Sequence, residues 1–254
     1  MKVNARLMVR SCLLLFVALF VMSSAASAKA KIVRNELVSE GKKRVYYLFV
    51  PEGVTASQPA PLLVTLHGSG RDGRILVEHW QELAEREKII VAGPDATDRA
   101  GWNVPADGPE FIRALVEELK AKQPVDARRV YLFGHSAGAV FGLYMSLLES
   151  QYFAATAVHA GALRSDDARL ISTAERKIPV AIFVGTNDAF FPLPDVRRTR
   201  ESLAAAGLPV ELTEIPKHDH FYYGRSKEIN AGAWEFLKKH KLDADPQYTE
   251  HRFR

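Results

Sequence analysis

A serine with a glycine two residues before it and another two residues after it is the feature that most constrains this chain. The run Gly134–Gly138 reads Gly-His-Ser-Ala-Gly. Residues 129–133 before it are β-branched and aromatic, which predicts a strand, and residues 139–148 after it have the apolar character of a buried helix. A Cβ at either glycine would crowd the neighbouring elements of such a sharp turn. The pattern therefore predicts that Ser136 lies at a strained strand-to-helix turn, where its hydroxyl is exposed as a nucleophile.

Apolar and amphipathic segments alternate along the rest of the chain. Several apolar segments are continuous runs, as expected for parallel strands that are covered on both faces. The alternation predicts an α/β fold with a doubly wound, mostly parallel sheet that binds ligands at the carboxyl ends of its strands. The predicted elements are strands at residues 44–50, 62–66, 88–92, 129–133, 155–159, 179–184 and 210–215, and helices that include residues 76–84, 111–119, 139–148, 196–206 and 226–240.

The connections between these elements are short. Residues 160–178 leave room for a loop and a short helix, so we expect no cap domain and an open active site that suits bulky or polymeric substrates. Asp107 and Glu110 have the spacing of a capping box at the start of a predicted helix. Asp195 directly precedes the predicted helix at residues 196–206 and is placed as its N-cap.

Residues 1–28 have the composition of a secretory signal peptide. Three basic residues precede an apolar run at residues 12–22, and small residues follow up to Ala28. The apolar run is too short to span a bilayer comfortably. Cleavage after Ala28 is favoured over cleavage after Ala30 and over retention as a membrane anchor. We therefore expect an exported protein, periplasmic or secreted, without stable membrane insertion after cleavage.

The remainder is expected to form one catalytic domain at residues 29–241, followed by a poorly ordered tail at residues 242–254. Three of the 34 Lys and Arg residues and none of the 30 Asp and Glu residues lie in the signal segment, so the exported chain is nearly neutral. It has no basic stripe for nucleic acid. The only cysteine, Cys12, leaves with the signal, which excludes a disulfide or a thiol nucleophile afterwards. The oligomeric state stays open.

A serine nucleophile needs a histidine base and a carboxylate that orients the histidine. In this kind of fold the three follow one another as serine, acid and histidine. Asp188 follows the predicted strand at residues 179–184 and is the favoured acid. Asp195 is the fallback, and Asp166 and Asp167, which follow the preceding strand, are lesser alternatives.

The base is expected in the loop after the last strand, which contains two histidines. His220 is favoured over His218 because the aromatic Phe221 and the approach to the final helix match the usual position of the base. The pair could instead bind a metal, but a third ligand is not evident nearby. We therefore expect neither a metal nor a cofactor.

The remaining site candidates surround these residues. The oxyanion of a tetrahedral intermediate needs two backbone N–H donors, and Ala137 and Ser69 are the predicted sources. His159 ends a strand near the site, and His67 is expected to hold its loop. The predicted substrate-binding residues are Trp102, His135, Phe190 and Phe221.

Together these motifs resemble the α/β-hydrolase superfamily, and within it the secreted serine esterases of the polyhydroxybutyrate depolymerase-like, feruloyl esterase-like and acetylxylan esterase-like groups. The resemblance implies ester hydrolysis through an acyl-enzyme, with Ser136, Asp188 and His220 as the triad and Trp102 near the substrate. Many members carry a cysteine where this chain has Ser69. The matching motifs are Leu66–Gly68, Gly101–Asn103, Glu110–Leu115, Val125–Val130, Gly134–Gly138 and Gly185–Asp188.

Other functions stay open on the same fold. A small serine peptidase or an envelope acyltransferase would use the same triad. A non-catalytic hydrolase-like binding protein usually lacks a triad residue, and none is missing here. The expected partner is a small-molecule or polymer-derived ester, whose acyl length and alcohol the sequence leaves open.

Overall fold

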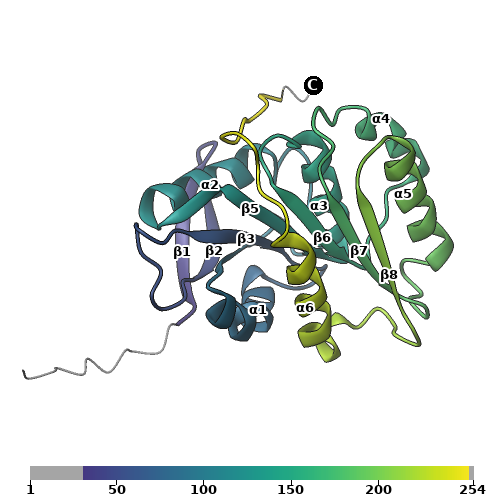
Figure 1. Ribbon diagram of the computed structural model, residues 1–254, viewed down its shortest axis with the longest axis horizontal. Helices are drawn as coiled ribbons and strands as arrows, with labels where there is room; N and C mark the ends of the chain where they lie inside the picture. Colours follow the sequence, from purple (N-terminus) through teal and green to yellow (C-terminus); the bar gives the residue numbers. More distant parts are fainter. Residues whose placement is uncertain (1–30, 252–254) are drawn as a thin grey trace, which may run out of the picture.

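The computed structural model describes residues 31–251 (Figure 1). The predicted signal segment, residues 1–28, lies outside them. None of the helices in the described part is both long enough and apolar enough to cross a membrane.

An eight-stranded sheet runs through the middle of the molecule in the order β1-β2-β4-β3-β5-β6-β7-β8. β1 and β2 are antiparallel to their neighbours, and the other strands run parallel. The predicted α/β fold with a mostly parallel sheet is therefore confirmed. The strands are β1 Val33–Ser39, β2 Lys42–Phe49, β3 Ala60–Leu66, β4 Ile90–Pro94, β5 Val125–His135, β6 Ala155–His159, β7 Val180–Gly185 and β8 Val210–Ile215.

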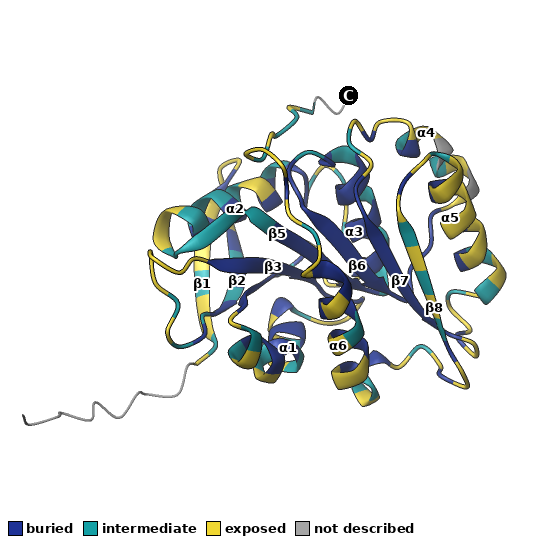
Figure 2. Ribbon diagram, viewed as in Figure 1, coloured by how far each residue is buried: buried dark blue, intermediate teal, exposed yellow. Residues whose placement is uncertain are grey.

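Helices cover both faces of the sheet, with α1 and α6 on one face and α2, α3 and α5 on the other (Figure 1). Alternate residues of a strand point to opposite faces, so Leu63 packs with α1 and α6 whereas Leu62 and Val64 pack with α2 and α3. The central strands β3, β4, β6 and β7 are buried throughout, whereas the edge strands β1 and β8 include exposed residues (Figure 2). The helices are α1 Gly73–Glu87, α2 Glu110–Lys122, α3 Ala137–Leu148, α4 Ala168–Ile171, α5 Leu193–Ala205 and α6 Ser226–Leu237, with short 3-10 turns at Ser165–Asp167 and Tyr222–Gly224.

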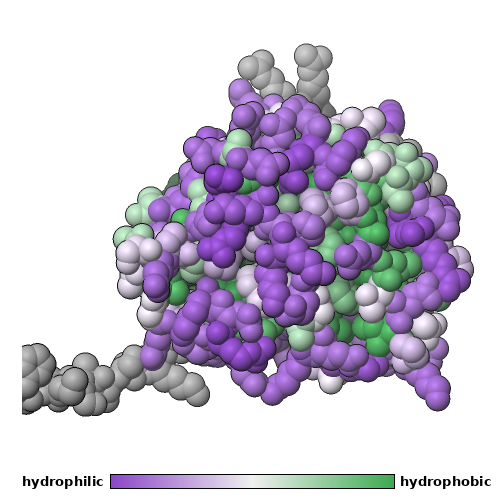
Figure 3. Space-filling model, in the orientation of Figure 1, coloured by the Kyte–Doolittle hydropathy of each residue, from purple (hydrophilic) through white to green (hydrophobic). Residues whose placement is uncertain are grey.

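The connection from β6 to β7 contains one 3-10 turn and the four-residue α4, so no cap domain lies between these strands. The face of the molecule seen in Figure 3 is largely hydrophilic, with a hydrophobic region between α6 and β8. A groove of about 320 Å³ lies there, and Phe183, Ile215 and Phe236 are among its lining residues.

Both predicted helix caps are wrong. Pro109 precedes α2, and Asp107 is fully buried instead. Its carboxylate accepts a hydrogen bond from Arg44 at 2.6 Å and further bonds from Thr97. Arg44 lies on β2, so its guanidinium holds the Asp107 carboxylate away from the start of α2. Asp195 lies inside the first turn of α5 and pairs with Arg198 at 2.9 Å.

The described part of the C-terminal tail also differs from the prediction of poor order. Leu242 is buried, and its N–H donates to the carbonyl of Arg128 at 3.0 Å. Farther on, the N–H of Thr249 donates to the Glu149 carboxylate at 3.1 Å, and the Tyr248 ring lies 6.0 Å from that of Tyr152. These contacts dock residues 242–251 on the domain although they form no regular element.

Candidate active site

The predicted strand-to-helix turn holds Ser136 in strained backbone between β5 and α3. Its φ is 57° and its ψ is −120°, a backbone conformation that residues other than glycine rarely adopt. A Cβ at Gly134 would lie 2.2 Å from the carbonyl oxygen of Gly138, and one at Gly138 would lie 2.0 Å from that of Leu66. Both glycines are therefore required for the turn to pack this closely.

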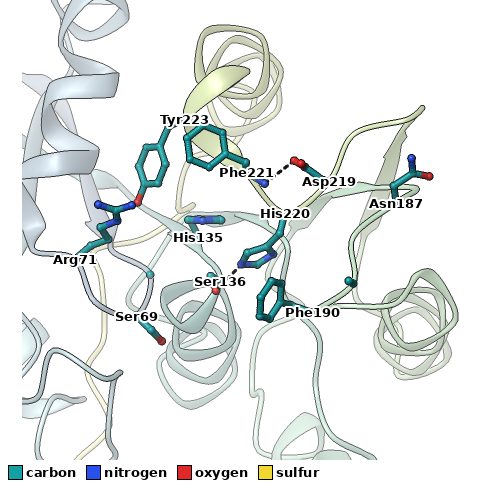
Figure 4. Close-up of a pocket in the computed structure, with 12 residues that line it drawn as sticks. Ser69, Arg71, His135, Ser136, Asn187, Phe190, Asp219, His220, Phe221 and Tyr223 are labelled. Carbon is teal, nitrogen blue, oxygen red and sulfur yellow. Dashed lines mark hydrogen bonds between the residues drawn. The ribbon is translucent and has the colours of Figure 1, made fainter.

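Ser136, His220 and Asp188 meet at the carboxyl ends of the strands. The imidazole Nε2 of His220 lies 2.9 Å from Ser136 Oγ (Figure 4). Its Nδ1 lies 2.9 Å from Asp188 Oδ2. Ser136 follows β5, Asp188 follows β7 and His220 follows β8. The order and geometry are those of a nucleophile, a base and an orienting acid.

The Asp188 carboxylate is held ionised by its hydrogen bonds. Burial raises the pKa of this carboxyl, but the bonds from His220 and from the N–H groups of Phe191 and Phe190 outweigh burial, so the pKa lies below its ordinary value. An ionised Asp188 keeps a proton on His220 Nδ1, which leaves Nε2 free to accept the serine proton.

The alternative acids and the alternative base lie elsewhere. Asp167 accepts a hydrogen bond from Tyr144 at 2.8 Å, and Asp195 is engaged with Arg198. The ring of His218 bonds to His159 at 3.1 Å, not to Ser136. The structure thus brings together the favoured residue at each position.

A cavity of about 520 Å³ opens over Ser136 and His220. Of the predicted contact residues, Ser69, His135, Phe190 and Phe221 line it (Figure 4). Sequence reasoning missed three polar residues of this lining, of which Arg71 directly follows the predicted oxyanion turn and Asn187 and Asp219 adjoin the acid and the base. Their positions beside predicted site residues were the available signal.

Trp102 is not among the residues that line this cavity, and its role near the substrate stays a prediction. Its ring stacks on Phe141 at 4.8 Å, and its indole N–H donates to the carbonyl of His67 at 2.8 Å. Since His67 begins the turn that contains Ser69, Trp102 supports the cavity wall from behind.

The predicted oxyanion donors flank the serine. Ala137 is the first residue of α3, so its N–H has no hydrogen-bond partner within the helix. Ser69 lies opposite, in the turn after β3, between Gly68 and the left-handed Gly70 at a φ of 73°. The positive end of α3 also favours negative charge near Ser136. Their role as oxyanion donors stays a prediction.

Comparisons with known proteins give a consistent picture. The model of the dienelactone hydrolase family matches residues 85–243. A bifunctional acetylxylan esterase/xylanase of Neocallimastix patriciarum is 26% identical over 162 residues, which cover 62% of this chain and 23% of that protein. Poly(3-hydroxyalkanoate) depolymerase C of Paucimonas lemoignei is 29% identical over 175 residues, which cover 63% of this chain and 42% of that protein. The chain thus spans less than half the length of these two relatives.

The structure is similar to that of a ferulic acid esterase of the anaerobic fungus Anaeromyces mucronatus, with a TM-score of 0.65 at 18% identity. The match covers 85% of this chain and 92% of that one. At this identity the similarity supports the shared fold.

Proposed function

We propose that this chain, which belongs to the dienelactone hydrolase family of α/β-hydrolases, is an exported serine hydrolase that cleaves carboxylic esters through an acyl-enzyme. The observation that carries the proposal is the pair of 2.9 Å contacts that joins Ser136, His220 and Asp188 beneath an open cavity. The names of the relatives add support, because both include cleavage of ester-containing polymers among their printed activities.

Acylation begins when Ser136 Oγ attacks the ester carbonyl carbon and His220 Nε2 takes the hydroxyl proton. The N–H groups of Ala137 and Ser69 hold the negative charge that develops on the carbonyl oxygen. When the tetrahedral intermediate collapses, its bond to the alcohol oxygen breaks and His220 gives its proton to the leaving alcohol. Asp188 stabilises the imidazolium between these two transfers.

Deacylation repeats the sequence with water. His220 removes a proton from a water molecule as the water oxygen attacks the acyl carbon, and the proton then passes to Ser136 Oγ as the acid is released. The ester and one water molecule thus become an acid and an alcohol, and the free enzyme is restored.

The substrate is proposed to be a small-molecule or polymer-derived ester with an apolar part. Phe190 and Phe221 are 76% and 58% exposed and lie at the cavity next to His220. An apolar ligand that covers exposed phenyl rings removes apolar surface from water, and this favours binding. We propose that these two rings, with His135 deeper in the cavity, contact the acyl or alcohol part.

Export and domain limits belong to the same proposal. We expect residues 1–28 to be removed and residues 29–241 to carry the activity. Expression of the full chain in a Gram-negative host, followed by fractionation and N-terminal sequencing, should find a periplasmic or secreted protein that begins at Lys29. A full-length chain retained in the cytoplasm or the membrane would contradict export without affecting the proposed chemistry.

Ester turnover by Ser136→Ala tests the chemistry. The variant should lose hydrolysis of p-nitrophenyl esters while it keeps the unfolding temperature of the wild type. Ser226→Ala is a matched control, because Ser226 Oγ also lies 2.8 Å from a histidine, His79, but does not line the catalytic cavity. This control should stay active. Unchanged activity of the purified Ser136 variant would exclude the proposal.

A substrate panel separates ester hydrolysis from the other reactions of this fold. It should contain esters from acetyl to long acyl, a feruloyl ester, hydroxybutyrate oligomers and an aminoacyl amide, each with and without an added alcohol or sugar. Preference for the amide would indicate a peptidase, and dependence on the acceptor an acyltransferase.

A further inference from the structure

Three buried histidines form a hydrogen-bonded chain beneath the candidate active site. His135 precedes Ser136 at the end of β5, His159 ends β6, and His218 lies two residues before His220. They are 4%, 0% and 5% exposed. His135 Nδ1 lies 3.0 Å from His159 Nδ1, and His159 Nε2 lies 3.1 Å from His218 Nε2. His159 and His218 have no part in the proton transfers proposed above.

Neutral imidazoles suit this arrangement. Each ring-to-ring bond contains one proton, and a neutral imidazole has one N–H donor and one nitrogen acceptor, so the central His159 can donate to one neighbour and accept from the other. Burial, reinforced by the neighbouring histidines, lowers the pKa of His135 to about 3 and that of His159 to about 2. The three histidines are therefore uncharged at neutral pH, and both ring nitrogens of His159 are hydrogen-bonded.

The histidine chain joins the strand of the nucleophile to the loop of the base. The backbone of this loop is attached on its other side, where the N–H of Asn187 donates to the carbonyl of His218 at 2.9 Å and the N–H of Lys217 donates to Thr186 Oγ1 at 2.9 Å. Those bonds fix the loop relative to β7. The histidine chain adds a direct side-chain link from the same loop to β6 and β5, and the contact between Ser136 and His220 depends on the position of the loop relative to β5.

The residues around the histidine chain are closely packed. The ring of Tyr222 stacks on His135 at 5.2 Å and lies 5.6 Å from His159. Its hydroxyl donates to Asn230 of α6 at 2.5 Å, so Tyr222 is itself held in place. The His135 ring lies 5.1 Å from His220. A displacement of the central histidine is therefore passed directly to the rings beside the base.

We infer that His159 is a positioning residue for ester cleavage, because its two ring bonds connect the serine turn to the histidine loop and so set the distance between Ser136 Oγ and His220 Nε2. The inference rests on the proposed function of these two residues. A displacement of the base by about 1 Å is enough to lower a rate by about 100-fold. Phe190 and Phe221, the exposed rings proposed to contact the substrate, make no bond to the histidine chain, so we expect KM to change little.

Two substitutions at His159 and one on the same strand test this role. His159→Leu removes both ring bonds at similar volume, and His159→Gln keeps an amide that donates and accepts. Thr156→Val, also on β6, is the control, since it removes a buried hydrogen bond between Thr156 and Ser146 of α3 without touching the histidine chain. For each variant we would measure kcat and KM on a short ester, the rate of fluorophosphonate labelling and the unfolding temperature.

We expect His159→Leu to lower kcat and the labelling rate about 10- to 100-fold with KM within about twofold. His159→Gln should recover part of this loss, and Thr156→Val should keep the kcat of the wild type even if its unfolding temperature falls. A folded His159→Leu variant with kcat within twofold of the wild type would overturn the inference. Equal losses in the Leu, Gln and control variants would also overturn it, by indicating general destabilisation.

A second substitution keeps the test decisive if His159→Leu does not fold. His218→Leu, which removes the ring bond at the other end of the histidine chain, should also lower kcat with KM unchanged, and normal kcat there would contradict the inference. Failure of the proposed function is recognised separately, because wild-type protein would then hydrolyse no ester or would hydrolyse it without Ser136.

Discussion

The floor and the rim of the cavity are built in opposite ways. The floor, made of His135, His159 and His218, is at most 5% exposed, and each ring is fixed by a hydrogen bond to the next. The rim, made of Phe190 and Phe221, is 76% and 58% exposed. Under the proposed function, the contrast predicts that buried side chains fix the geometry of the reaction, whereas side chains in solvent set substrate preference. Changes beneath the serine should alter kcat, and changes at the rim should alter KM.

The largest expected effect comes from Asp188, the candidate acid behind His220. Asp188→Asn should lower kcat about 10⁴-fold, because the amide stabilises the wrong tautomer of His220. Asp195→Asn, at the acid that the sequence left as a fallback, should stay within twofold of wild type. Steady-state kinetics on one ester decides between them, and the reverse ranking would move the acid to α5.

The next effect concerns the buried ion pair between Arg44 and Asp107. Asp107→Leu should lower the free energy of unfolding by about 3 to 5 kcal/mol, because Arg44 would be left buried without its partner. Glu36→Gln breaks an exposed ion pair on β1 and should change nothing measurable. Urea unfolding of both variants provides the comparison. If Asp107→Leu and Glu36→Gln had the same free energy of unfolding, the buried ion pair would contribute no more to stability than the exposed one.

Buried neutral histidines also make stability depend on pH. An unfolded histidine has a pKa near 6.5, while His135 and His159 have much lower values when folded. Below pH 6.5 the unfolded chain therefore binds protons that the folded chain does not, and the free energy of unfolding falls as the pH falls. Replacing His159 by Leu should flatten this fall by about 1.4 kcal/mol per pH unit between pH 6 and 5.

Unfolding measurements at several pH values, with Thr156→Val as the control, test this dependence. The control should keep the slope of the wild type. An unchanged slope in His159→Leu would mean that the ring is protonated in the folded protein, which contradicts the neutral floor.

The smallest effect is expected at the rim. Phe190→Ala or Phe221→Ala should raise KM for aromatic or long-acyl esters up to about tenfold, equivalent to about 1.4 kcal/mol of lost apolar contact. Values for an acetyl ester and all kcat values should hardly change. A fall in kcat with unchanged KM would remove the distinction between floor and rim.

Most of the fold could be predicted from the sequence because buried parallel strands are continuous apolar runs. The exception is β1, which alternates charged and apolar residues and has Val33 and Val38 exposed at 52% and 72%. It pairs at the edge of the sheet, so little burial marks it in the sequence.

The residues of the candidate triad could be located because each follows a predicted strand in the expected order. The environments behind them depend on contacts that local pattern does not encode. Asp107 and Glu110 have the spacing of a helix cap, yet the partner of Asp107 is Arg44 on β2. His135 and His159 become neighbours through the register of β5 and β6, and Trp102 turns inward only because its loop returns to His67.

Mass spectrometry of the chain after reaction with a fluorophosphonate tests the central claim most directly. We predict one covalent adduct, located on the peptide that contains Ser136, absent in Ser136→Ala and formed much more slowly in Asp188→Asn. An active enzyme that acquires no adduct, or acquires it on another serine, would contradict the account.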